Sequence, residues 1–529
     1  MGQIVRDLDA AAKRRYDVIV IGGGIYGAML VYEGSRRGLS CLLLEKDDFG
    51  HHTSFNNLRI VHGGLRYLQT LDFHRFRESY RERSWFLKHF PHLITPLPCM
   101  MPLYGNGLRR PAVMQWALLL NDLLSGNRNH GIEKDRRIPN GKVIDARTTE
   151  ELFPAVDRKY LRGAATWYDA YMPDSPRIII ELLRTACGMG AFVLNYCEVR
   201  DIVTSRGEAA GVDGSDRTTG NTVRFEAPVV VNTAGPWTRE LAAKFDADYP
   251  ELFRPSLAWN LLLDRPALST HALALAPKKP NARTYFVLPY KGKMLAGTGH
   301  SPWHSEPFAN PKPDEILHHD FLEDLNQAVP GLNLSTDDIS HIFTGLLPAK
   351  HDETAELAVR ETVIDHFATG GPKGLVSVSG VKFTTSRLVA EKALNIIMAR
   401  YLPGKASKGS ATASGGDLLH AQPAHRLHAG LEAREDFWKE ILKIIDDEAV
   451  VHLDDLICRR TSLWEDRDFA LQLAERVSAI AGWDRSRQKS EADRLTMWYQ
   501  TRTHPNRVRQ GQPVFNQCTV GEGAEGNAF

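Results

Sequence analysis

The sequence lacks the cysteine pairs that would indicate a disulfide framework or a zinc cluster. Six cysteines are scattered among 529 residues without a C-x-x-C pair, which is typical of a reducing compartment. It also lacks an excess of either charge, since 65 Lys and Arg stand against 64 Asp and Glu, a formal net charge of +1. Without a basic excess or a long basic run, we expect no nucleic-acid partner.

Long hydrophobic runs are missing as well. No apolar run is long enough to cross a bilayer, and the first fifteen residues carry charges without the apolar stretch of a signal peptide. We therefore expect a cytoplasmic protein, and leave open a peripheral contact with the inner face of the membrane. Hydrophobic residues at 43% and charged residues at 24% are ordinary for a globular chain. At roughly 150 residues per domain, the length suggests three or four folding units.

A dinucleotide-binding motif is present near the start of the chain. A β-branched run, residues 17–21, leads into Gly22-Gly-Gly24-Ile-Tyr-Gly27, and a helical pattern and a second apolar strand ending at Glu45 follow. In this strand–turn–helix context the first glycine makes the tight turn, the second admits a pyrophosphate and the third lets helix and strand pack closely. The Glu45 carboxylate can accept hydrogen bonds from ribose hydroxyls and disfavours a 2′-phosphate.

The motif does not by itself identify the dinucleotide. Only one such motif occurs at a strand–helix junction, whereas a flavoenzyme reduced by NAD(P)H would usually need two. The spacing therefore leaves two readings, NAD alone or FAD with the substrate as electron donor.

Later segments indicate inserted domains. Apolar strands at 228–231 and 375–378 are far from the first strand in sequence, as expected when other domains interrupt a parallel sheet. Runs at 259–263 and 284–288 suggest antiparallel strands. Residues 405–416 are rich in Ser, Gly, Ala and Thr and are typical of a linker.

Four further segments carry a resemblance. They are Thr53-Ser54 with the string H-G-G-L-R-Y-L at 62–68, V-V-V-N-T-A-G-P-W at 229–237, F-V-L-P at 286–289 with Gly297-Thr298, and G-V-K-F-T-T-S-R at 380–387. In this order they resemble the FAD-dependent glycerol-3-phosphate dehydrogenase and oxidase family, over about residues 16–500. The string D-L-I-C-R-R-T at 455–461 also looks like that family's helical C-terminal domain.

The resemblance implies an α/β fold: a Rossmann-like FAD-binding domain with an inserted antiparallel-sheet substrate domain and a C-terminal helical domain. The implied FAD-binding domain is discontinuous, at 16–90, 160–250 and 345–404, and the substrate domain covers 91–159 and 251–344. The linker at 405–416 leads to the helical domain at 417–518, and 519–529 is a flexible tail.

The resemblance also implies FAD as the cofactor and a set of residues that bind it. Backbone N–H groups between a strand ending near Ser379 and a helix starting near Phe383 would face the negative charge that hydride transfer leaves on the flavin, and Lys382 would add a cation there. The predicted cofactor-binding residues are Gly22, Gly24, Ile25, Tyr26, Gly27, Glu45, Lys46, Thr53, Ser54, His62, Gly63, Gly64, Val199, Ala234, Gly235, Trp237, Gly380, Val381, Lys382, Phe383 and Thr384.

Oxidation of a secondary alcohol also needs a base for the hydroxyl proton. His62 is the best candidate, because an imidazole titrates near neutral pH, although a buried histidine bonded to backbone is the alternative. We predict His62, Arg66 and Lys382 as catalytic residues and Tyr67 and Arg360 as substrate-binding residues.

The sequence departs from the family on the substrate side. Leu347 stands where the family usually has an arginine that grips the substrate phosphate, and the serine-rich run after Thr53-Ser54 is altered. A leucine cannot pair with a phosphate, so Lys350, His351 or Arg59 would have to compensate. The expected function is oxidation of glycerol 3-phosphate or a related polyol or phosphoester to a ketone, with the actual substrate undetermined.

Several alternatives stay open. One alternative function is that of an FAD-dependent amine or amino-acid oxidase, and another is that of an inactive flavin-binding homologue. The electron acceptor is quinone or oxygen, and a homodimer is possible.

The apolar stretch 111–124 after Arg109-Arg110 fits a helix on a membrane surface, although core packing explains the same pattern. The pair His51-His52 invites a covalent flavin link, whereas loop histidines are more often solvated. His300 and His304 have no evident third ligand, so no metal is predicted.

Overall fold

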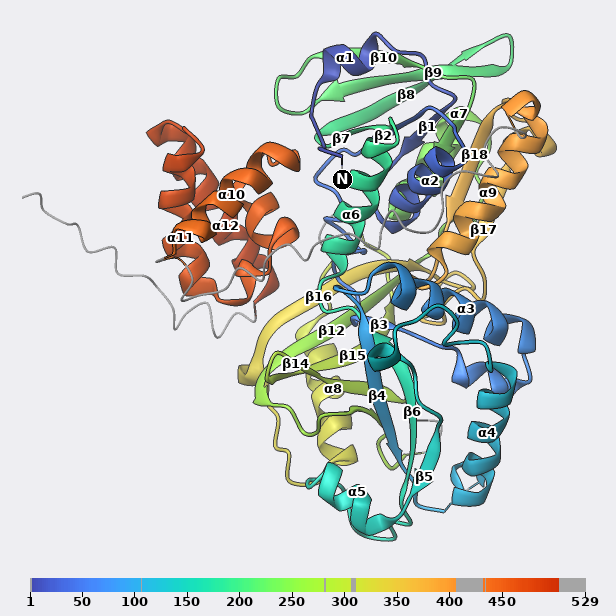
Figure 1. Ribbon diagram of the computed structural model, residues 1–529, viewed down its shortest axis with the longest axis vertical. Coiled ribbons are helices and arrows are strands. Elements are labelled where there is room, and N and C mark those ends of the chain that lie inside the picture. The colour runs from blue at the N-terminus through green and yellow to red at the C-terminus, as the bar shows by residue number, and fades with distance from the viewer. Residues whose placement is uncertain are drawn as a thin grey trace, which may run out of the picture.

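The computed structural model describes residues 2–105, 107–279, 282–305, 311–405, 432 and 434–503. Most of the predicted linker at 405–416 and the whole predicted tail at 519–529 lie outside these residues. Within them the chain is a mixed α/β fold with two large sheets and a helical C-terminal region (Figure 1).

The first sheet carries the glycine motif and is buried on both faces. Val18 and Val20 of its central strand point into one core, whereas Ile19 and Ile21 point into another, as the continuous apolar pattern predicts for a parallel strand. Its order is β17 (Thr362–Asp365), β18 (Leu375–Ser379), β11 (Val230–Asn232), β1 (Val18–Ile21), β2 (Cys41–Leu44) and β7 (Phe192–Leu194), parallel except for β17.

Helices and a small sheet cover the two faces of this first sheet. One face packs against α2 (Ile25–Arg36), α6 (Ser175–Gly188) and α9 (Ser386–Arg400). The other meets α1 (Leu8–Ala12), α7 (Thr238–Phe245) and an antiparallel sheet of β8 (Cys197–Ser205), β9 (Glu208–Asp216) and β10 (Thr222–Glu226).

The second large sheet is mainly antiparallel and lies below the first in Figure 1. In the described part of the chain its order is β16 (Ile339–Pro348), β12 (Pro255–Pro266), β15 (Lys293–Pro302), β14 (Tyr285–Tyr290), β13 (Ala272–Leu275), β4 (Thr95–Pro102), β6 (Ala164–Tyr171) and β3 (Ile60–Val61), with β5 (Lys142–Ile144) paired to β6. The helices of this region are α3 (Phe73–His89), α4 (Pro111–Leu124), α5 (Ala146–Leu152) and α8 (Glu315–Ala328).

Strand pairing shifts the expected division of the chain. The predicted boundary at residue 160 leaves Ala164–Tyr171 in the FAD-binding part, but this strand pairs with β4 over its whole length. The short strand Ile60–Val61 pairs with β6 in turn. Both strands therefore belong to the second sheet, so the chain enters that sheet before Ile60 and leaves it after Tyr171, not near residues 90 and 160 as predicted.

The C-terminal region is helical, as the resemblance implies, and is drawn in orange and red in Figure 1. It contains α10 (Glu435–Asp447), a π-helical segment at Asp455–Arg460, α11 (Arg467–Ile480) and α12 (Arg485–Arg502). Trp464 and Trp498 share a core with Phe55 and with Phe343 of β16. The helical region thus packs against both the loop after β2 and the second sheet.

Candidate active site

The site begins at the turn between β1 and α2. Gly22 has φ of +102°, and a Cβ at this residue would lie 2.6 Å from the Thr233 carbonyl oxygen. A Cβ on Gly27 would lie 1.9 Å from the Gly22 oxygen, so only glycine fits either position. Gly24 caps α2 without a side chain of its own and lines a cavity. The start of the helix is therefore open to a phosphate group, as the motif predicts.

This cavity has a volume of about 350 Å³ and extends from the glycine turn to the end of β18. Most of the predicted cofactor residues line it. They are Gly22, Gly24, Ile25, Tyr26, Glu45, Lys46, Thr53, Ser54, Val199, Ala234, Gly235, Trp237, Gly380, Val381, Lys382 and Phe383. The remaining predicted cofactor residues, Gly27, His62, Gly63, Gly64 and Thr384, are not among its lining residues.

Glu45 lies at the end of β2, where the motif predicts a carboxylate. It is buried, and burial raises the pKa of its carboxyl group. One oxygen accepts from the Gly23 N–H at 2.6 Å and the other from the Asp47 N–H at 2.8 Å. Glu45 therefore ties the glycine turn to the loop after β2, while its contact with a ribose stays a prediction.

The turn after β18 also forms part of the cavity wall. The Tyr26 hydroxyl donates to the Lys382 carbonyl at 2.7 Å and accepts from the Lys382 N–H at 3.0 Å. A Cβ on Gly380 would collide with the Tyr26 ring at 1.7 Å. The following helix begins at Ser386, not near Phe383 as expected. The expectation of free N–H groups here is therefore wrong for Lys382, because the Tyr26 hydroxyl occupies its N–H.

Lys382 connects the cavity to a second, smaller one of about 40 Å³, which Arg360 also lines. The Lys382 ammonium lies 4.5 Å from the centre of the Tyr67 ring. Burial lowers the pKa of Lys382 to about 8, and the positive charge of Arg66 adds to this effect. The structure thus brings together four residues predicted from three separate segments: Arg66, Tyr67, Arg360 and Lys382.

His62 is half-exposed and is held by a carboxylate that the sequence analysis missed. Its Nδ1 lies 3.3 Å from a carboxylate oxygen of buried Asp169, whose other oxygen accepts from the Gly63 N–H at 2.6 Å. Burial favours the neutral acid, but His62, Arg83 and the Gly63 N–H outweigh it and hold the pKa of Asp169 below its usual value. A lone acid in the otherwise uncharged strand 164–171 was the available signal.

The end of the cavity formed by the second sheet is apolar or neutral. Leu58, Ala258 and Leu347 line it with Asn260 and Thr298. The Thr298 hydroxyl donates to the Asn260 side-chain oxygen at 2.9 Å. None of the positive groups proposed to replace the missing arginine lines this cavity.

The three suggested replacements lie elsewhere. Arg59 is only 1% exposed and packs between the rings of Phe55 and Phe343. Lys350 pairs with Glu356 at 3.3 Å, and His351 is exposed. Compensation for Leu347 by any of them is therefore not supported by their positions.

Both histidines of the His51-His52 pair line the cavity. His52 bonds Asp47 at 2.7 Å, and the buried Nδ1 of His51 has no hydrogen-bond partner among the described residues. They are not freely solvated, and a covalent flavin link stays a prediction.

A comparison with protein families matches residues 17–394 to the FAD-dependent oxidoreductase family. The chain is 31% identical over 407 residues to a glycerol-3-phosphate dehydrogenase from Synechocystis, covering 73% of this chain and 71% of the relative. It is 30% identical to the mitochondrial glycerol-3-phosphate dehydrogenase of Schizosaccharomyces pombe, covering 74% of this chain and 63% of the relative.

Solved structures share the fold. The glycerol-3-phosphate dehydrogenase from Bacillus halodurans, complexed with FAD, superposes with a TM-score of 0.70 at 20% identity, over 94% of this chain and 97% of that one. The L-proline dehydrogenase from P. horikoshii superposes with a TM-score of 0.52 at 16% identity, over 74% and 95%. Because a glycerol-3-phosphate dehydrogenase and an L-proline dehydrogenase share this fold, the fold alone does not select the substrate.

Proposed function

The chain belongs to the FAD-dependent oxidoreductase family, and we propose that it oxidises the secondary alcohol of glycerol 3-phosphate, or of a related polyol or phosphoester, to a ketone. The observation that carries the proposal is the position of Lys382. It lines the dinucleotide cavity on one side and, with Arg360, the small second cavity on the other. An anionic substrate beside these two cations would be adjacent to the cofactor.

The cavity fits FAD in its chemistry. Gly24 leaves the start of α2 clear for a pyrophosphate, Glu45 offers a carboxylate for a ribose, and Lys382 places a cation at the far end. When bound, FAD supplies the acceptor for a hydride from the substrate carbon. Lys382 would then stabilise the negative charge that accumulates next to it.

We assign His62 as the base. With its Nδ1–H directed at Asp169, His62 keeps the lone pair of Nε2 to accept the hydroxyl proton, and the side chain is half-exposed. Asp169 fixes this orientation and favours the imidazolium that forms. His62 does not line the large cavity, so the substrate would extend from that cavity towards His62 rather than lie wholly within it.

The test is anaerobic reduction of the bound flavin by a panel of candidate substrates. Glycerol 3-phosphate, or a related phosphorylated or unphosphorylated polyol, is expected to bleach the flavin absorbance and yield a ketone. Bleaching by glycine or proline instead, with release of ammonia or an imine, would support an amine oxidase. No bleaching by any compound would support an inactive homologue.

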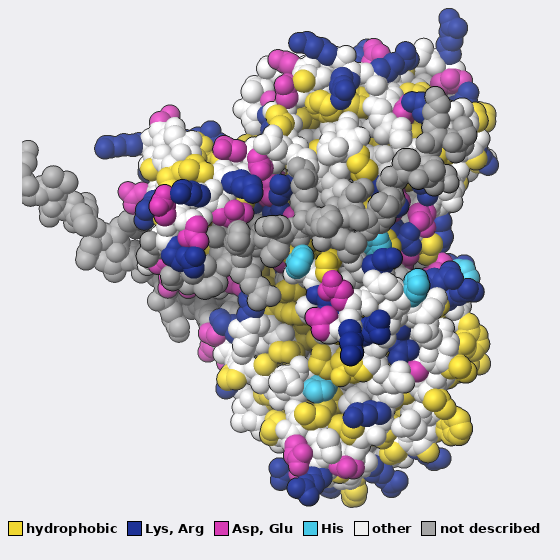
Figure 2. Space-filling model, viewed as in Figure 1, with side chains coloured by type: hydrophobic (Ala, Val, Ile, Leu, Met, Phe, Trp, Pro, Cys, Tyr) yellow, Lys and Arg dark blue, Asp and Glu magenta, His cyan; other side chains and the backbone are white. Residues whose placement is uncertain are grey.

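We also propose that α4 rests on a membrane surface. Of its apolar side chains only Met114 and Leu118 are buried, so core packing does not explain the pattern. The others form an exposed face, visible as yellow side chains at the lower right edge of Figure 2: Val113, Trp116, Leu119, Leu120, Leu123 and Leu124. Arg109 and Arg110 precede this face and suit an anionic lipid surface.

No helix among the described residues is both long and apolar enough to cross a membrane. Contact through α4 would therefore be peripheral, and would favour a membrane quinone over oxygen as electron acceptor. Flotation with vesicles containing anionic lipid checks the contact. Trp116→Ser with Leu123→Ser is expected to abolish flotation while leaving flavin reduction unchanged, and flotation equal to that of the wild type would refute the assignment.

A further inference from the structure

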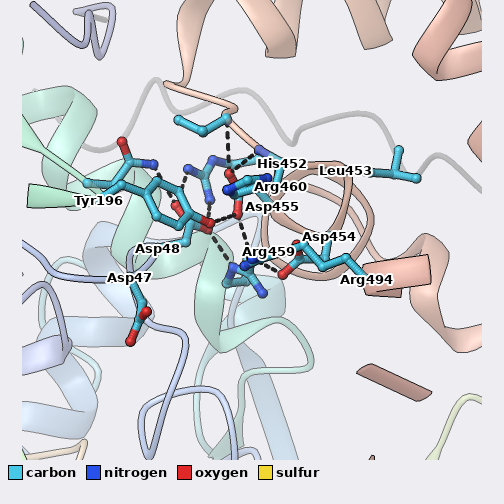
Figure 3. Close-up of polar contacts among 12 residues, drawn as sticks. Asp47, Asp48, Tyr196, His452, Leu453, Asp454, Asp455, Arg459, Arg460 and Arg494 are labelled. Atoms are coloured by element: carbon cyan, nitrogen blue, oxygen red, sulfur yellow. Dashed lines mark hydrogen bonds and ion pairs between the residues drawn. The ribbon is translucent and has the colours of Figure 1, made fainter. Parts of the chain in front are cut away.

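The loop after β2 has two sides with different roles. Glu45, Lys46 and the segment Gly50–Ser54 line the dinucleotide cavity. Asp48 does not line it. Its side chain is fully buried between the first sheet and the C-terminal helical region, and in Figure 3 Asp47 lies away from the network that surrounds Asp48.

Two consecutive arginines of the C-terminal region hold Asp48. Arg460 donates to both of its oxygens, at 2.6 and 2.7 Å, and Arg459 donates to one of them at 2.5 Å. The Asn195 side chain donates the remaining bond at 2.9 Å. Burial favours the neutral form of Asp48, but the two guanidinium groups outweigh it and hold its pKa far below the usual value. The carboxylate is therefore charged and fully paired.

The two arginines are themselves held by other residues of the C-terminal region. Arg459 also donates to Asp454 and Asp455, both at 2.6 Å, and Arg460 donates to the Glu448 carbonyl at 3.0 Å. Both guanidinium groups are 1% exposed or less. Because these bonds fix the two guanidinium groups, the bidentate pair of Arg460 with Asp48 permits little displacement of Asp48.

We infer that Arg459 and Arg460 are positioning residues for the FAD site, which hold the cavity-lining loop in place through Asp48. No described residue of the C-terminal region lines the large cavity, since the lining ends at Phe383. The helical region would therefore influence cofactor affinity without touching the cofactor. The inference rests on FAD as the cofactor and not on the identity of the substrate.

Thermodynamic linkage makes the effect reciprocal. If a docked helical region favours FAD binding, then bound FAD favours docking by the same factor. Local opening of the segment Asp454–Arg460 should become rarer when FAD is bound, although this segment has no residue in the cavity.

The test uses the full chain stripped of FAD and titrated with FAD, with flavin fluorescence as the readout. Arg460→Met is expected to raise the dissociation constant of FAD at least tenfold, and Arg460→Lys to raise it less, because a lysine keeps the charge but not the two parallel bonds. With saturating FAD, the rate of flavin reduction should return to that of the wild type.

Arg184→Met is the matched control. Arg184 also links the FAD-binding part to the C-terminal region, pairing with Glu448 at 2.7 Å, but does not contact the loop. It should change the FAD dissociation constant less than twofold. An unchanged constant in Arg460→Met, or an equal increase in Arg184→Met, would overturn the inference.

Hydrogen exchange of the wild-type chain provides a second measurement should Arg460→Met fail to fold. Amides of 454–460 are expected to exchange at least several-fold more slowly with FAD than without it. Equal exchange in the two states would refute the coupling.

Discussion

The two ends of the large cavity are built in different ways. The dinucleotide end is formed by backbone turns, at Gly22–Gly24 and Gly380–Lys382, that lie directly after β1 and β18. The end at the second sheet is formed by single side chains of separate strands, such as Asn260, Thr298 and Leu347. A turn constrains several consecutive residues, whereas a side chain on a strand can change alone. The second end is therefore free to diverge in substrate while the first keeps its cofactor.

The largest expected effect separates the chemistry from cofactor binding. His62→Ala removes the proposed base, which in general contributes about 10²- to 10⁴-fold to a rate. We expect anaerobic flavin reduction by substrate to slow by about 1,000-fold, with FAD affinity unchanged. Stopped-flow absorbance measures the rate, and FAD titration measures the affinity.

Asp169→Asn is the companion variant, because it keeps the shape of the partner of His62 but removes its charge. It should slow reduction less than His62→Ala does. A rate for His62→Ala within threefold of the wild type would show that another group takes the proton.

The opposite effect is expected at the dinucleotide end. Gly24 has an ordinary φ, and a Cβ there meets only the Ser54 hydroxyl, at 3.2 Å, so Gly24→Val should fold but place its side chain in the cavity. We expect FAD affinity to fall about 100-fold, equivalent to about 2.7 kcal/mol. Gly404→Ala is the control, since a Cβ at this residue meets nothing within 4 Å.

The dinucleotide end could be predicted from the sequence because it consists of consecutive residues of a turn, which is also why it resists change. Gly22, Gly24, Gly27 and Glu45 form a local pattern, and the structure places the glycines at the turn after β1 and Glu45 directly after β2, bonded to the Gly23 N–H. Asp169 was missed because its partner His62 is far away in sequence, and only the pairing of β6 with β3 and β4 brings them together.

The buried charges of the C-terminal region escaped sequence analysis as well. The resemblance located the string containing Arg459 and Arg460, but nothing in it identifies Asp48 as their partner. The last helix of this part begins at Ser386 and not near Phe383, and no local pattern reveals that the Lys382 N–H donates to the Tyr26 hydroxyl of another element. In each case a long-range contact decided the outcome.

A smaller effect is expected from restoring charge at the end formed by the second sheet. Leu347→Arg adds a guanidinium group to a neutral wall, and a new charge-assisted bond to a phosphate is worth about 1.5 kcal/mol, or roughly tenfold. We expect KM for glycerol 3-phosphate to fall about tenfold, with kcat little changed and with no change for unphosphorylated glycerol. Leu347→Met is the neutral control. An equal change for both substrates would mean that Leu347 does not face the phosphate.

The smallest effect concerns Lys382, which lines both the large cavity and the small one. Burial lowers its pKa to about 8, so its charge is present below pH 8 and is lost as the pH rises through that value. Between pH 7 and pH 8.5 its protonated fraction falls about fourfold, and the rate of flavin reduction should fall by the same factor. Arginine stays protonated over this range, so Lys382→Arg should remove the decline. A decline that persists in Lys382→Arg would have to be assigned to a group other than Lys382.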